Sequence, residues 1–165
     1  QGYQSTRILV WKDPWAYPQD GGYQIIQSLY AIGSGGLLGL GLGKSRQKFL
    51  YLPEPENDFI FAIVCEELGY VGAAIVILLF VLLIIRGYWL AVHARDRFGS
   101  LLVVGITTLL AVQVFLNISV VTNLLPTTGI SLPFFSYGGT ALMIQLAEMG
   151  MVLSVSRQIS APRQE

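Results

Sequence analysis

Residues 59–85 read FIFAIVCEELGYVGAAIVILLFVLLII, and this stretch decides the fold class. Its last part, Leu68–Ile85, is 18 residues long and carries no charged side chain. As an α-helix this part extends about 27 Å, close to the roughly 30 Å thickness of the hydrocarbon core of a bilayer. We therefore predict a transmembrane helix over residues 59–85, with Glu66 and Glu67 near one membrane interface.

Two further apolar stretches follow along the chain. Residues 99–125 carry no charge, and residues 138–156 carry only Glu148. Across all 165 residues, 53% are hydrophobic and 12% are charged, which is about half the charged share of roughly 25% in soluble domains. The chain is therefore predicted to be an all-α polytopic membrane protein with three spanning helices, an uncharged loop at 126–137 and a polar tail at 157–165.

The segment before the first span, residues 1–58, is polar and irregular at its start. Residues 25–43 carry no charge but contain six glycines, and each glycine inside a helix costs about 1 kcal/mol relative to alanine. We expect a helix over about 23–32, followed by a glycine-rich stretch that lies on the bilayer or dips into it. Aromatic side chains near the start fit either a membrane interface or a small core under the loop: Trp11, Trp15 and Tyr17.

Arginine and lysine are unevenly distributed between the loops, which predicts the orientation. Residues 86–98 contain three arginines and one aspartate, whereas residues 126–137 contain no charge. Because short basic loops stay in the cytoplasm, loop 86–98 and the tail 157–165 are predicted to be cytoplasmic. Loop 126–137 and, by helix count, residues 1–58 are then outside. The chain starts at Gln1 with no signal peptide, so we expect that an N-terminal part of the full protein precedes it.

Two groups in the outer segment could carry chemistry. Asp58 stands where this segment enters the first span, and it could either cap that helix or act as a base toward a hydroxyl. The basic cluster Lys44, Arg46 and Lys48 could bind phosphate or stabilise a departing pyrophosphate, or it could contact anionic lipid headgroups. A base, a cation cluster and a flexible groove together suit transfer from a phospholipid donor.

Other ionisable residues point to structural roles. Cys65 is a lone cysteine within an apolar run, and no Cys/His cluster predicts a metal site. Glu148 is interpreted as a protonated side chain bonded to polar groups such as Gln113 or Asn117, although acids inside a membrane are functional candidates by default. The formal net charge is zero, so the chain gives no sign of a nucleic-acid partner.

Two long motifs carry a family resemblance. The stretch GYQIIQSLYAIGSGGLLGLGLGKSRQKFLYLPEPENDFIFAIVCEELGYVG resembles the extracytoplasmic loop and following helix of the FtsW/RodA/SpoVE (SEDS) family, and NISVVTNLLPTTGISLPFFSYGGTA is similar to its C-terminal signature. The resemblance covers nearly the whole chain, with Thr140 where serine is usual and Asn57 where threonine is common. It implies a ten-helix fold, of which the last three helices are present here.

The resemblance implies an activity and a partner. Family members are peptidoglycan glycosyltransferases that polymerise lipid II, an undecaprenyl-pyrophosphate-linked precursor, together with a class B penicillin-binding transpeptidase. The family's essential aspartate falls on Asp58. Substrate-binding positions of the outer loop fall on Gln47, Lys48 and Arg7. We add Arg46 and Lys44 as further substrate-binding cations, and Ser136 and Tyr137 as residues expected to line the groove.

Two other functions remain open from the sequence. The protein could transport lipid II across the bilayer, or it could act as a scaffold for a transpeptidase or another protein of division or elongation. No cofactor is identified, although a divalent cation could assist. Roles in division, cell shape and sporulation are not separated by the sequence. This chain alone is expected to be inactive, because missing helices must complete the groove.

Overall fold

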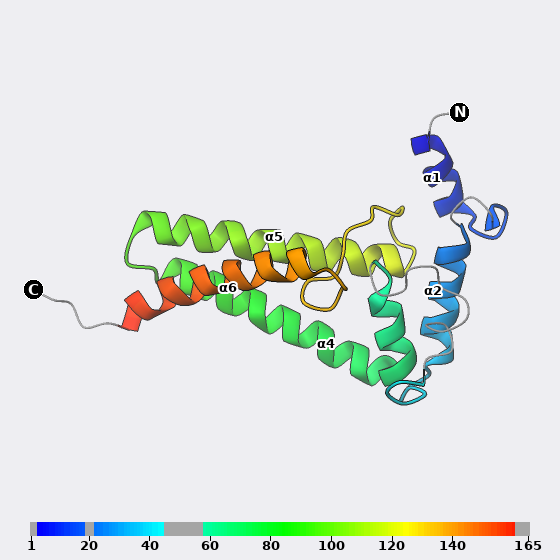
Figure 1. Cartoon of the computed structure of the whole chain (residues 1–165), viewed down its shortest axis with the longest axis horizontal. Helices are drawn as coiled ribbons and strands as arrows, with labels where there is room; N and C mark the ends of the chain where they lie inside the picture. The colour runs from blue at the N-terminus through cyan, green and yellow to red at the C-terminus, as the bar shows by residue number, and fades with distance from the viewer. Residues whose placement is uncertain (1–2, 19–21, 45–57, 161–165) are drawn as a thin grey trace, which may run out of the picture. The chain divides into compact units, whose positions relative to one another are not determined.

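The computed structural model describes residues 3–18, 22–44 and 58–160, and these residues form helices joined by loops (Figure 1). No β-strand occurs in the described part of the chain. The all-α class predicted from the composition is confirmed. The helices are α1 (Tyr3–Lys12), α2 (Tyr23–Ser34), α4 (Ile60–Val92), α5 (Arg97–Val121) and α6 (Gly139–Ser160).

Three of these helices are long and apolar enough to cross a membrane. They comprise Ile60–Val92, Arg97–Val121 and Gly139–Ile159, and they correspond to the three predicted spans. The helix α2 covers the stretch in which a helix over about 23–32 was expected. The three long helices agree with a multi-pass membrane protein.

Helix α4 continues beyond residue 85, through residues that the sequence assigned to a cytoplasmic loop. Leu90 and Ala91 are buried in a core formed with α5 and α6, so packing maintains the helix past its first arginine. The guanidinium of Arg86 lies 4.3 Å from the ring centroid of Trp89, one turn further along. The apolar run therefore ends before Arg86, whereas the helix itself continues to Val92.

Helix α4 is also broken, which the sequence analysis did not predict. Gly69 has φ 67° and ψ −172°, a conformation that is essentially restricted to glycine. A Cβ atom at this position would clash with the backbone nitrogen of Gly39 and would lie 2.6 Å from the carbonyl oxygen of Leu37. The glycine-rich stretch packs directly against this point of the predicted span.

The backbone groups released by the break are paired with residues 35–44, here called the glycine loop. Carbonyls at the end of the first half of α4 accept hydrogen bonds from the loop: Leu40 N to Glu66 O (3.0 Å) and Gly41 N to Glu67 O (3.0 Å). In return, Tyr70 N donates to Gly36 O at 3.0 Å and Val71 N to Leu37 O at 3.3 Å. Irregular backbone at membrane depth requires such partners, because lipid offers none.

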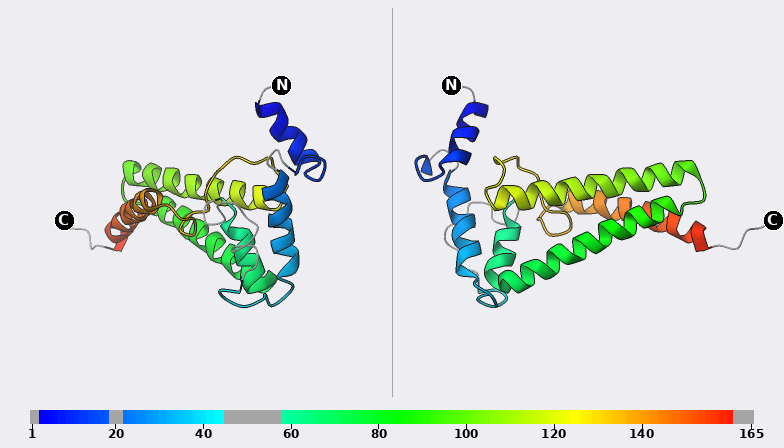
Figure 2. Two further views of the ribbon diagram at one scale, coloured as in Figure 1. Left: turned by 45° about the vertical axis from the view of Figure 1, so that its right-hand side comes forward. Right: turned by 180° about the vertical axis from the view of Figure 1, so that it is seen from behind.

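The chain divides into two compact units. Gln1–Val76 and Gln113–Tyr137 form the first, here called the clamped unit, and Ile77–Val112 and Gly138–Glu165 form the second, here called the helical unit. The clamped unit contains α1, α2, the glycine loop and the loop after α5. The helical unit contains the second part of α4, the first part of α5 and all of α6 (Figure 2).

Candidate functional site

Asp58 lies two residues before the first residue of α4 and is half-buried. The amide nitrogen Nδ2 of Asn117, on α5, donates to the carbonyl oxygens of Asp58 and Ile130, both at 2.8 Å. On the loop side, a Cβ atom added to Gly129 would lie 3.5 Å from the carboxylate Oδ2 of Asp58. The start of α4, the end of α5 and the loop that follows α5 therefore meet at Asp58.

The loop after α5, residues 122–137, is held to α1 by three hydrogen bonds. The guanidinium of Arg7 donates to the carbonyl oxygen of Thr127 at 3.0 Å. The indole Nε1 of Trp11 donates to the carbonyl oxygen of Asn123 at 3.1 Å, and the Nδ2 of Asn123 donates to the carbonyl oxygen of Trp11 at 3.4 Å. The structure thus brings two predicted site residues, Arg7 and Asp58, to the same short loop.

Helix α2 is attached to the end of α5 by a buried serine. The hydroxyl of Ser28 is 2.8 Å from the carbonyl oxygen of Ile25 and 3.1 Å from that of Val121. Apolar side chains of the same helix, Ile25, Ile26 and Ala31, are buried around it. The contacts of Ser28, Arg7 and Trp11 anchor both N-terminal helices to the segment that carries loop 122–137.

Ser136 and Tyr137, predicted to line the groove, stand at the C-terminal end of this loop. The hydroxyl oxygen of Ser136 accepts a hydrogen bond from the backbone nitrogen of Leu132 at 2.8 Å, so it stabilises a turn of the loop itself. The side chain of Tyr137 is 79% exposed and is available for contact. Phe134 lies between Leu132 and Ser136 in the sequence and has a φ of 65°, so the loop turns tightly at this residue.

The predicted cation cluster is described only at Lys44. This residue is exposed, and its backbone nitrogen donates to Gly41 O at 3.1 Å within the glycine loop. The other predicted substrate-binding residues of this segment, Arg46, Gln47 and Lys48, lie outside the described residues.

Sequence reasoning missed the role of Asn117. It considered this amide as a partner for Glu148, whereas the amide nitrogen binds the carbonyls of Asp58 and Ile130. Only 1% of Asn117 is exposed, and its surroundings on α5 are mostly apolar. A polar side chain buried in a spanning helix needs a hydrogen-bond partner. An asparagine inside a predicted span is therefore the sequence signal that could have identified Asn117 as a contact between segments.

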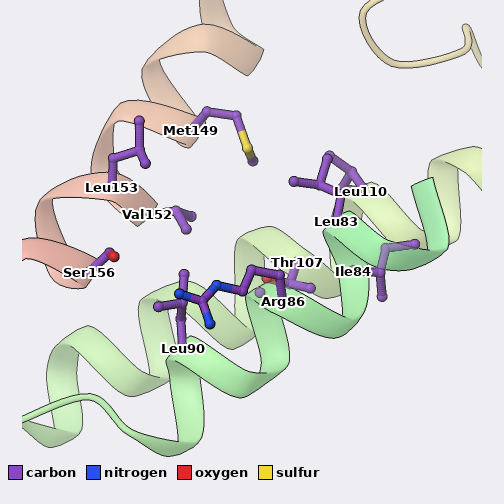
Figure 3. A pocket seen from close by; sticks show the side chains of 11 residues that line it. Leu83, Ile84, Arg86, Leu90, Thr107, Leu110, Met149, Val152, Leu153 and Ser156 are labelled. Carbon is purple, nitrogen blue, oxygen red and sulfur yellow. The ribbon is translucent and has the colours of Figure 1, made fainter. Parts of the chain in front are cut away.

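A cavity of about 390 Å³ lies in the helical unit (Figure 3). Its lining is mainly aliphatic, with Arg86, Thr107 and Ser156 as its polar members and no carboxylate. None of the predicted site residues lines it. The described lining of this cavity therefore contains no carboxylate that could act as an acid or a base.

Comparison with known proteins identifies the family. Residues 1–161 match the profile of the FtsW/RodA/SpoVE family, described as cell cycle proteins. Stage V sporulation protein E of Bacillus subtilis is 55% identical over 155 residues, which cover 94% of this chain and 42% of that protein. The probable peptidoglycan glycosyltransferase FtsW of the same organism is 48% identical over 151 residues, covering 92% of this chain and 38% of the relative.

Two solved structures have a similar fold. One is a chain from a study of how a peptidoglycan synthase complex coordinates polymerization and crosslinking, with a TM-score of 0.74, 33% identity and coverage of 98% of this chain and 44% of that chain. The other is a point variant of the rod shape determining protein RodA of Thermus thermophilus, with a TM-score of 0.62, 35% identity and coverage of 82% and 41%. The chain spans about two fifths of the length of these relatives, and it belongs to the FtsW/RodA/SpoVE family of cell cycle proteins.

Proposed function

We propose that the full-length protein is a peptidoglycan glycosyltransferase that polymerises lipid II at the outer face of the bacterial cytoplasmic membrane. Relatives named probable peptidoglycan glycosyltransferase FtsW, at 45–48% identity, support this activity. The observation that carries the proposal is the placement of Asp58: a half-buried carboxylate at the start of a spanning helix, fixed between α5 and loop 122–137.

In the proposed reaction Asp58 is the general base. It takes the proton from the 4-hydroxyl of the acceptor sugar on lipid II, and that oxygen forms a bond to the anomeric carbon of the growing strand. The bond between this carbon and the pyrophosphate oxygen breaks, and undecaprenyl pyrophosphate leaves with the electron pair. A positioned carboxylate can supply such proton transfer, which typically contributes 10²–10⁴-fold to a rate.

The leaving pyrophosphate needs cations. We assign this role to Lys48, assisted by Arg46 and Arg7, with Lys44 and Gln47 in the same segment binding substrate. The hydrogen bond from Arg7 to Thr127 supports its part, because it holds one of these cations beside the loop that also flanks Asp58. Tyr137, exposed at the end of that loop, and the neighbouring Ser136 complete the proposed groove.

The proposed orientation places residues 1–58 and 126–137 outside, and residues 86–98 and 157–165 in the cytoplasm. The arginines of loop 86–98 support this assignment. A second support is that the carbonyls of Asp58 and Ile130 bind one amide group, so the segments before α4 and after α5 end at the same level. These two segments would then face the same side of the membrane.

We further propose that the protein works with a class B penicillin-binding transpeptidase. The similarity to a chain from a peptidoglycan synthase complex that polymerises and crosslinks supports a partner of this kind. The proposal assigns no cofactor to the protein. Adding a chelator to the polymerisation assay tests whether a divalent cation assists.

The test uses the purified full-length protein with its transpeptidase partner and lipid II, and it compares the wild type with Asp58→Ala. Glycan strands from the wild type and none from a folded variant would support both the activity and the base. Equal strand synthesis by both would leave the polymerase standing and return Asp58 to a helix cap. If neither made strands, translocation of lipid II across vesicle membranes would be measured next, because a transporter would move lipid II without polymerising it.

A further inference from the structure

Asn117 is a buried amide in a mostly apolar helix, with 1% of its surface exposed. Burying an amide costs free energy unless its polar atoms are hydrogen-bonded. The side-chain nitrogen of Asn117 carries two hydrogens, and it has two acceptors at 2.8 Å, the carbonyl oxygens of Asp58 and Ile130. Its two amide hydrogens therefore bind one carbonyl from each of the two backbone segments that meet at the Asp58 carboxylate.

The first of these contacts fixes the segment that leads into α4. The opening turn of α4 is closed by Ala62 N donating to Phe59 O at 3.0 Å. The carbonyl of Asp58 lies just before this turn and is bound by Asn117. Asn117 therefore fixes the backbone directly before the first turn of α4.

The second contact fixes loop 122–137 on the other side of the carboxylate. Ile130, whose carbonyl Asn117 also binds, follows Gly129, which has a φ of 73°. A Cβ at residue 129 would be 3.5 Å from the Asp58 Oδ2, so the carboxylate lies against the side-chain-free face of this glycine. One amide thus joins the backbone of Asp58 to the loop against which its carboxylate lies.

We propose that Asn117 is the positioning residue for the general base Asp58, holding its carboxylate against loop 122–137 at the height required by the acceptor hydroxyl. The proposal rests on the proposed function, in which Asp58 is the base. Misplacing a catalytic group by about 1 Å can cost about 10²-fold in rate, so loss of Asn117 should lower kcat far more than it weakens substrate binding.

The test measures kcat and KM for lipid II of the full-length protein with its transpeptidase partner. We expect Asn117→Ala to lower kcat by about 10- to 100-fold while KM stays within about twofold. Asn117→Leu keeps about the same shape without the amide donors, and its kcat should fall to the same extent. The matched control is Thr107→Val, which removes another buried polar group of α5 but lies in the helical unit.

A folded Asn117→Ala protein whose kcat is within twofold of the wild type would overturn the proposal, as would a change confined to KM or an equal loss of kcat in Thr107→Val. If Asn117→Ala does not fold, Asn117→Leu decides by the same criteria. Asp58→Ala is run in parallel. Normal polymerisation by Asp58→Ala would contradict the base assignment itself, whereas loss in Asp58→Ala with normal kcat in the Asn117 variants would contradict positioning alone.

Discussion

In the clamped unit, several side-chain amides and hydroxyls bind backbone carbonyls from distant parts of the chain. In the helical unit, aliphatic side chains pack one helix against another, and Ser100 adds a hydrogen bond to Ala91 O at 2.7 Å. Asn117, Asn123 and Ser28 each hold a carbonyl from a distant part of the chain. The core of the helical unit consists instead of aliphatic residues such as Leu90, Val103 and Val152. A unit that exposes irregular backbone in a membrane must pair its polar groups individually.

This difference between the two units predicts which substitutions change stability and which change activity. Packing tolerates small changes of shape with a moderate loss of free energy. A hydrogen bond between fixed partners also determines where those partners stand. We therefore expect substitutions in the helical unit to affect mainly the amount of folded protein, and those around Asp58 to affect turnover. The following variants of the full-length protein test this contrast.

The largest effect on stability is expected for Gly69→Ala in the clamped unit. The new Cβ would meet backbone atoms of Gly39 and Leu37 within 2.6 Å and would sit in a glycine-only conformation, which alone costs about 1–3 kcal/mol. We expect little folded protein in detergent by size-exclusion chromatography. The control Gly105→Ala has open space and a helical backbone, so it should melt at the wild-type temperature or above. Similar yields of the two variants would show that the break in α4 is not required.

An intermediate effect is expected for Leu90→Ala in the helical unit. Leu90 is buried in the core formed with Val103 and Val152, and truncating such a leucine costs about 2–5 kcal/mol. The melting temperature should fall, and the kcat of the remaining folded enzyme should be unchanged. Leu101→Ala, which truncates an exposed leucine of the same unit, should melt close to the wild type. A kcat loss in folded Leu90→Ala would contradict the separation of the two roles.

The smallest effect is expected for Ser28→Ala in the clamped unit. It removes the hydrogen bond to Val121 O and leaves a buried carbonyl with one partner fewer, which costs about 1 kcal/mol. Ser34→Ala is the matched control, because among the described residues the hydroxyl of Ser34 binds within its own helix, to Ala31 O. Thermal melts of the two variants give the difference directly. A larger loss for Ser34→Ala would show that the contact between α2 and α5 is unimportant.

Local patterns made part of the fold predictable. Hydropathy over one helix length identifies the three spans, and the glycine content marked where a regular helix stops. The position of Asp58 at a helix entrance follows from the charged stretch that precedes an apolar run. The residues that contact Asp58 in the structure cannot be predicted from this local pattern. Asn117 is 59 residues away in the sequence and reaches Asp58 only once α4 and α5 lie side by side.

The break at Gly69 shows the same limit. Glycine is common in membrane helices, so its presence within residues 59–85 does not predict a break. The conformation of Gly69 depends on the glycine loop, whose carbonyls accept the hydrogen bonds of Tyr70 and Val71. The residue at which α4 ends could not be predicted from the local sequence either. Leu90 and Ala91 extend the helix through contacts with α5 and α6, which lie far away in the sequence.

The central claim is that the carboxylate of Asp58 serves as a base in strand synthesis, and the most direct test is the isosteric pair Asp58→Asn and Asp96→Asn. Asp96 caps α5 through Gly99 N at 2.7 Å, and asparagine caps about equally well, so Asp96→Asn should polymerise lipid II at the wild-type rate. Asp58→Asn keeps the shape of the site without the base, and its rate should fall by at least about 10²-fold in a correctly folded protein. Equal rates for Asp58→Asn and Asp96→Asn would contradict the account.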